Sequence, residues 1–116
     1  MSPFLTIATV LCVVGISIGQ MLFKKAATVL PATPGWQDWV FNGWLLAALA
    51  LYGVTTLVWV WILRHAPLHL AYPFMGLAFL IVPILGWLFL QEPIHLRTLL
   101  GGALILAGIA LAASAT

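Results

Sequence analysis

The chain has 116 residues, of which 65% are hydrophobic and only 5% are charged, and its formal net charge is +2. Soluble domains carry charges on about a quarter of their residues, so this composition excludes an ordinary soluble domain and indicates an integral membrane protein. The charges form no basic face, which excludes a nucleic-acid-binding protein, and the single cysteine, Cys12, excludes an intrachain disulfide and a thiolate metal cluster.

The first apolar stretch, residues 3–23, would be about 31 Å long as a helix, which matches the hydrocarbon core of a bilayer. It predicts a retained transmembrane helix that ends at Lys24 and Lys25, because no Lys or Arg precedes it and it is longer than the core of a signal peptide. Gly15 and Gly19 form a small pair suited to close packing on another helix. A mostly polar stripe follows one side of this helix at spacings of three and four: Thr6, Thr9, Val13, Ser17, Gln20 and Lys24.

The segment of residues 26–42 predicts a turn at its prolines, followed by an interfacial segment in which Trp36, Trp39 and Phe41 act as membrane anchors. A second span is expected over residues 43–63 and a third over residues 70–90. Within the third span, Pro83 removes a backbone hydrogen bond and predicts a kink. Its conspicuous side chains share one stripe: Tyr72, Met75 or Gly76, Phe79, Pro83 and Gly86.

A fourth span, residues 96–113, is nearly free of polar side chains. Its small residues Gly101, Gly108 and Ala112 predict a smooth surface for helix packing or dimer contact. Because most connections are short, successive helices are expected to be antiparallel neighbours. The predicted fold is therefore a single all-α integral membrane domain over residues 1–116, a bundle of four transmembrane helices.

The alternation of helix directions decides which charges meet. Lys24, Lys25, Glu92 and Arg97 are expected on one side of the membrane, and Arg64, His65 and His69 on the other. Lys24 and Glu92 are thus possible partners. Lys and Arg near the helix ends number three against one, a difference too small to fix the orientation of the termini.

The candidate functional groups are polar or ionisable side chains at membrane depth: Ser17, Gln20, Lys24, Tyr72 and Glu92. One interpretation is structural, with Lys24 as a snorkelling anchor and Glu92 as an interfacial carboxylate. The other is a site in which Lys24 attracts an anionic headgroup and Glu92 pairs with Lys24 or with a cationic substituent. His65, His69 and His95 are expected in loops at opposite membrane sides, so no shared metal site is expected. The sequence has no two buried carboxylates, no phosphate-binding glycine loop and no candidate nucleophile with a nearby base, so no cofactor or enzymatic activity is expected either.

Four segments carry a family resemblance: residues 19–24 (GQMLFK), 71–73 (AYP), 91–93 (QEP) and 101–108 (GGALILAG). Together they resemble the small four-helix members of the drug/metabolite transporter superfamily, of the EamA and small multidrug resistance types. The order of the motifs is most similar to the Arn-type subunits of the undecaprenyl-phosphate aminoarabinose flippase.

The resemblance implies a multi-pass protein of the bacterial inner membrane that pairs with itself or with a related four-helix subunit and moves a polyprenyl-phosphate-linked sugar across the bilayer. By position it implies substrate contact by Gln20, Lys24, Tyr72 and Glu92, with Arg97 as a further candidate. Two alternatives remain at this stage, a non-transporting scaffold for a glycosyltransferase and an exporter of small cationic compounds. Proton-coupled exporters of the second kind resemble this chain but carry a glutamate in the first helix, where Ile16 stands here.

Overall fold

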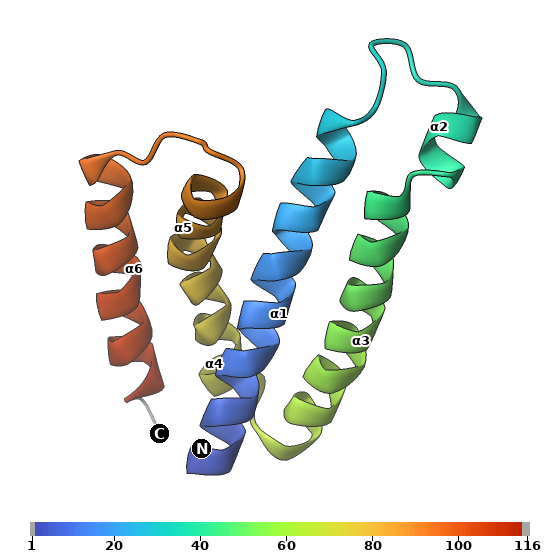
Figure 1. Ribbon diagram of the computed structural model, residues 1–116. Coiled ribbons are helices and arrows are strands. Elements are labelled where there is room, and N and C mark those ends of the chain that lie inside the picture. The colour runs from blue at the N-terminus through green and yellow to red at the C-terminus, as the bar shows by residue number, and fades with distance from the viewer. Residues whose placement is uncertain (1, 115–116) are drawn as a thin grey trace.

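The computed structural model describes residues 2–114, which form helices joined by connecting segments (Figure 1). Their order is α1 (Pro3–Thr28), α2 (Trp36–Val40), α3 (Gly43–His65), α4 (Leu68–Ala71), the 3₁₀ helix η1 (Tyr72–Leu77), α5 (Ala78–Phe89) and α6 (Leu96–Ala113). Four stretches are long and apolar enough to cross a membrane: Pro3–Thr28, Gly43–His65, Leu68–Phe89 and Leu96–Ala113. The described residues contain no β-strand, and the predicted all-α architecture with four transmembrane helices is confirmed.

Helix α1 is longer than its hydropathy predicts. Ser2 caps its N-terminus, since the Ser2 hydroxyl oxygen accepts a hydrogen bond from the Leu5 amide at 3.2 Å. The helix continues through Lys24 and Lys25 to Thr28, so the prediction that the lysines end it is wrong. Its 26 residues correspond to about 39 Å, which exceeds the hydrocarbon thickness of about 30 Å. The last turns of α1 therefore extend into the interfacial region.

The third span is not a uniform α-helix, because α4 passes through the 3₁₀ turns of η1 before α5 begins. Pro73 lies in the first turn of η1 and has no amide hydrogen to complete an α-helical bond. Pro83 lies inside α5, which continues through it. The departure from α-helical geometry thus lies in η1, before the position at which Pro83 predicts a kink.

The helices form a flat layer rather than a round bundle, with Cα extents of 49 × 35 × 18 Å. Helix α1 lies between α3 and α5, and α6 packs against η1 and α5 on the side away from α3 (Figure 1). Successive spans run in opposite directions, so the connections after α1 and after α5 lie at one end and the connection after α3 lies at the other. This places Lys24 and Glu92 at the same end, as predicted.

Glycines allow close packing at two places in the layer. A Cβ atom added at Gly15 would lie 2.9 Å from Cγ2 of Thr55, which brings α1 close to α3. A Cβ atom added at Gly102 would lie 2.6 Å from Cδ1 of Leu80, which brings α6 close to α5. Both contacts lie below the separations that Cβ atoms tolerate, so these helices approach as closely as they do because the residues are glycines.

The most tightly packed region lies toward the end where α3 passes into α4. Its buried side chains come from α1, α3 and the start of the third span: Cys12, Ile62, Ala66 and Ala71. The polar groups nearby are satisfied within the helices, since Thr9 donates to the Leu5 carbonyl at 2.7 Å and Ser17 donates to the Val13 carbonyl at 2.8 Å. This end of the layer therefore holds a buried cluster, whereas the cavities described below between α1 and α5 lie toward the other end.

Candidate functional site

A chain of three adjoining cavities runs between α1 and α5, and we call it the α1–α5 groove. The outer cavity, of about 590 Å³, lies among Lys24, Lys25, Thr28 and residues 89–92. The middle cavity, of about 380 Å³, shares Lys24, Leu90 and Glu92 with it. The inner cavity, of about 390 Å³, shares Gln20, Val82 and Pro83 with the middle one. The shared lining residues show that neighbouring cavities adjoin one another. A smaller cavity of about 190 Å³ also adjoins the outer one, since both are lined by Lys25, Phe89 and Leu90.

The chemistry of the groove changes along its length. Charged side chains, Lys24 and Glu92 among them, line the outer cavity. The middle cavity adds the amide of Gln20 and the hydroxyl of Thr98 to those charges. In the inner cavity Gln20 is the one polar side chain, beside the apolar residues Ile16, Ala78, Phe79, Val82 and Pro83. The groove therefore grades from charge to hydrocarbon, as an interfacial headgroup and its acyl or prenyl tail would require.

Glu92 is positioned by the way the chain leaves α5. The amides of Leu90 and Glu92 both donate to the Gly86 carbonyl, at 2.9 and 3.1 Å. Gln91 between them adopts a left-handed backbone with φ 56°, which reverses the chain over the helix end. The Glu92 carboxylate consequently folds back over Gly86, where an added Cβ atom would lie 3.8 Å from its Oε1 atom.

The two adjacent lysines of α1 have different surroundings. The Lys25 ammonium lies 5.8 Å from the ring centroid of Trp44 on α3, a cation–π arrangement. Lys24 lines the middle cavity together with Glu92, whereas Lys25 does not. Lys24 is therefore the cation that serves the deeper part of the groove.

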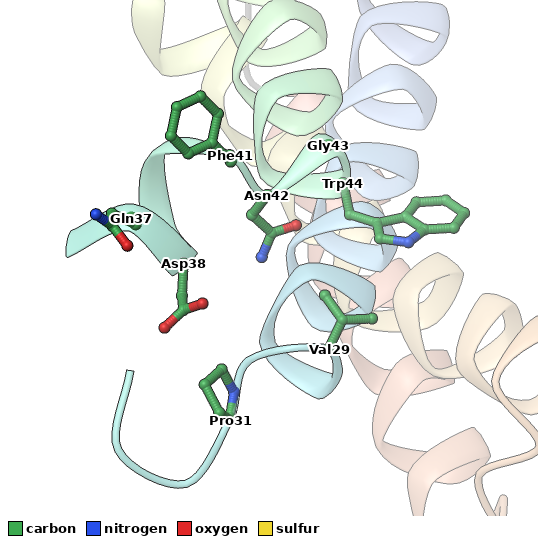
Figure 2. A pocket seen from close by; sticks show the side chains of 8 residues that line it. All are labelled: Val29, Pro31, Gln37, Asp38, Phe41, Asn42, Gly43 and Trp44. Carbon is green, nitrogen blue, oxygen red and sulfur yellow. The ribbon is translucent and has the colours of Figure 1, made fainter. Parts of the chain in front are cut away.

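A separate cavity of about 350 Å³ lies where α1, α2 and α3 approach one another (Figure 2). Figure 2 shows Asn42 and Asp38 among the side chains around it. Their polar groups serve the backbone, since Asn42 Nδ2 donates to the Ala26 carbonyl at 2.9 Å and Asp38 Oδ2 accepts from the Gly35 amide at 2.9 Å. We therefore interpret this cavity as part of the connection between α1 and α3.

Comparison with known proteins gives the family of the chain. The sequence pattern of the EamA-like transporter family matches residues 1–114. The chain belongs to this family. The resemblance drawn from its motifs is thereby confirmed, and the protein is a multi-pass membrane protein of a transporter family.

Similar EamA-type relatives include three proteins named as the probable 4-amino-4-deoxy-L-arabinose-phosphoundecaprenol flippase subunit ArnE. The one from Aeromonas salmonicida is 35% identical over 99 residues, covering 78% of this chain and 86% of the relative. The one from an Enterobacter species is 34% identical over 93 residues, covering 80% and 81%. The one from Salmonella paratyphi B is 35% identical over 100 residues, covering 86% and 89%. No solved structure matches the chain.

In this EamA-family chain the groove brings together three of the residues expected to contact substrate, Gln20, Lys24 and Glu92. Ser17 is buried on α1, and its hydroxyl is engaged with the backbone. Tyr72 is 62% exposed at the opposite end of the third span, and Arg97 is exposed in the first turn of α6. Neither lines the three cavities, and substrate contact by all six residues stays a prediction.

Several lining residues were not among the expected site residues. Pro83 and Gly86 lie on the predicted stripe of the third span. The sequence therefore predicted that they share one face of the helix, but it did not predict that they line a cavity. Thr98 is different, because it reaches the middle cavity only through the packing of α6 beside α5. No sequence pattern within α6 predicts that Thr98 lines a cavity.

The α6 surface expected to pack on a partner has free space around its glycines. Within the described residues, a Cβ atom added at Gly101 or Gly108 would meet no other segment within 4 Å. Between and beyond them, Leu104 and Leu111 are each 75% exposed. Ala112 is half-buried. Dimer contact through these residues stays a prediction.

Proposed function

We propose that this EamA-family protein is a flippase subunit that moves a polyprenyl-phosphate-linked sugar across the bacterial inner membrane. The observation that carries the proposal is the α1–α5 groove, with charge at its outer end and hydrocarbon at its inner end. A polyprenyl phosphate has the same order of chemistry along its length. The printed names of the ArnE relatives support the same substrate class.

Lys24 is the group proposed to attract the phosphate. A charge-assisted hydrogen bond to a phosphate is stronger in a poorly solvated site than in water, and Lys24 lies in the part of α1 that extends into the interfacial region, at the depth of lipid headgroups. Gln20 lies one turn further in and offers an amide to the phosphate or the sugar. Its position at the junction of two cavities supports a role along the path rather than at its entrance.

The inner cavity supports a prenyl tail rather than a proton-coupled cation. Ile16 lines it in the place where the related cation exporters carry a glutamate. Antiport of that kind needs a group whose protonation competes with the substrate, and an aliphatic side chain offers none. A tail of isoprene units, in contrast, is compatible with an apolar wall.

The proposal includes a second subunit, either another copy or a related four-helix chain. The flat layer leaves the groove without a wall on its open side, and α6 offers an apolar surface with small residues for helix packing. A partner gives a headgroup a more enclosed path than one layer does.

The test uses proteoliposomes that contain the purified protein, alone or with a related four-helix subunit, and undecaprenyl-phosphate aminoarabinose. Headgroup transfer is expected, and Lys24→Ala and Glu92→Ala should each lower its rate about tenfold or more. Arg64→Ala, which removes a charge at the opposite end, should transfer at the wild-type rate. Absence of transfer from both reconstitutions, with copurification of a glycosyltransferase, would replace the proposal with a scaffold role.

A further inference from the structure

The α1–α5 groove holds opposite charges that are not satisfied by each other. Lys24 and Glu92 line the same two cavities, and no ion pair within 4.0 Å joins them in the described part of the chain. A ligand with one charge would leave the other protein charge poorly paired. A ligand with an anion and a cation in the complementary order gives each protein charge a partner.

Glu92 has a fixed backbone and an accessible carboxylate. The backbone is held by the hydrogen bond to the Gly86 carbonyl at 3.1 Å, and Pro93 restricts it further to an extended conformation. The side chain is exposed, and its Oε1 atom lies near Gly86 at the end of α5. The carboxylate is therefore accessible to a ligand in the groove.

The two charges can be assigned to two parts of a ligand. A tail in the apolar inner cavity would bring the phosphate at its head within reach of Gln20 and Lys24, which line the adjoining middle cavity. The sugar then extends toward the outer cavity, where Glu92 is available to a cationic substituent. The volumes of the cavities, about 380 and 590 Å³, fall within the range of about 300–1,000 Å³ that small-molecule sites occupy.

We infer that the groove selects a zwitterionic headgroup, in which Lys24 binds the phosphate and Glu92 binds the ammonium group of an amino sugar. The inference rests on the proposed function and adds to it the residue that distinguishes an amino sugar from a neutral one. A neutral sugar would still be held by its phosphate. Glu92 would then discriminate against it by the loss of one charge-assisted hydrogen bond.

The test is a binding measurement on the full-length protein in lipid nanodiscs, alone and together with a related four-helix subunit. Two probes are used, farnesyl-phosphate-linked 4-amino-4-deoxy-arabinose and its N-formyl derivative, in which the amine is a neutral amide. The wild type is expected to bind the amino probe about tenfold to a hundredfold more tightly. Glu92→Gln should abolish this preference and leave the affinity for the N-formyl probe within about twofold of the wild type.

Two variants serve as controls. Asp38→Asn removes the other carboxylate of the chain, which lies on α2 outside the groove, and should keep the wild-type preference. Glu92→Asp retains the charge and should keep a preference, so a loss in Glu92→Gln alone is attributable to charge rather than to misfolding.

The outcomes separate this inference from the proposed function. If the wild type binds both probes equally, or if Glu92→Gln weakens both equally, Glu92 does not select the amine, although the protein can still be a flippase subunit. If the wild type binds neither probe, the proposed function fails and this inference fails with it. Retained preference in Glu92→Gln would also overturn the inference.

Discussion

The side chain of Asn42, the residue before α3, forms a hydrogen bond with the Ala26 carbonyl near the end of α1. Its Nδ2 atom donates to that carbonyl at 2.9 Å, while its Oδ1 atom accepts from the Leu45 amide at 3.2 Å. The carbonyls of the last helical turn and the amides of the first have no partner within their own helices, and one buried side chain here satisfies one of each. The register between α1 and α3 therefore depends on Asn42.

Replacing Asn42 by alanine should destabilise the protein by about 2 kcal/mol or more, because the α3 cap is lost and the Ala26 carbonyl loses a hydrogen bond. Thermal unfolding in detergent micelles, followed by circular dichroism, measures the change. Asn42→Asp keeps the cap but places a carboxylate oxygen against the Ala26 carbonyl oxygen in a buried position, so it should also destabilise the protein. Gln37→Ala, an exposed amide beside the same cavity, should change stability by less than about 0.5 kcal/mol. Equal effects at both positions would contradict the role of Asn42.

A second prediction concerns the contact of α1 with α3. Gly15→Ala places a Cβ atom 2.9 Å from Thr55 Cγ2, and Thr55 is buried and β-branched, so the helices must separate slightly. We expect a loss of about 1–3 kcal/mol. Gly53→Ala is the matched control, since its Cβ atom would meet nothing within 4 Å; it should be neutral or stabilising by up to about 1 kcal/mol. The same unfolding experiment compares them, and a neutral Gly15→Ala would show that α1 and α3 are not closely packed there.

The sequence predicted the fold well because in a membrane the hydrophobic spans themselves decide it. Residues 43–63 and 96–113 correspond closely to Gly43–His65 and Leu96–Ala113. The end of α1 was missed because Lys24 and Lys25 stop the hydrocarbon span without stopping the helix, whose backbone bonds continue through alanines to Thr28. Hydropathy reports where lipid ends rather than where a helix ends.

The part of the candidate site that the sequence predicted is the pair of residues that lie at the same end of the layer. Lys24 and Glu92 were paired by the alternation of helix directions, and both line the same cavities. The polar stripe of α1 is divided, because Ser17 is buried with its hydroxyl bonded to the Val13 carbonyl, whereas Gln20 lines the groove. Tyr72 shares a stripe with Pro83 in a regular helix, but it is the first residue of η1, at the far end of the span from the groove. The spacing of residues along the sequence predicts which side chains share a face of a helix. It does not predict which part of that face a neighbouring helix will bury.

A third prediction tests the left-handed residue before Glu92. Gln91 has φ 56°, which costs a residue with a Cβ atom about 1 kcal/mol relative to glycine. Gln91→Gly should therefore keep or raise thermal stability, whereas Gln91→Val should lower it by about 1–2 kcal/mol, because a β-branched side chain disfavours this conformation. If Glu92 is positioned by this turn, Gln91→Val should also lower the transfer rate in proteoliposomes. Normal transfer by a folded Gln91→Val protein would show that the turn does not position the carboxylate.

The last prediction concerns the exposed face of α6. A larger residue at Gly108 has free space within the chain, so Gly108→Ile should leave the circular dichroism spectrum and the monomer unfolding transition close to those of the wild type. If a second subunit packs on this face, the added side chain holds the two helices apart and weakens their association by about 1–3 kcal/mol. Energy transfer between donor- and acceptor-labelled proteins in liposomes measures the association. Gly53→Ile, at an equally open glycine on α3, controls for the substitution itself; if it weakens association and Gly108→Ile does not, the partner packs on α3 instead.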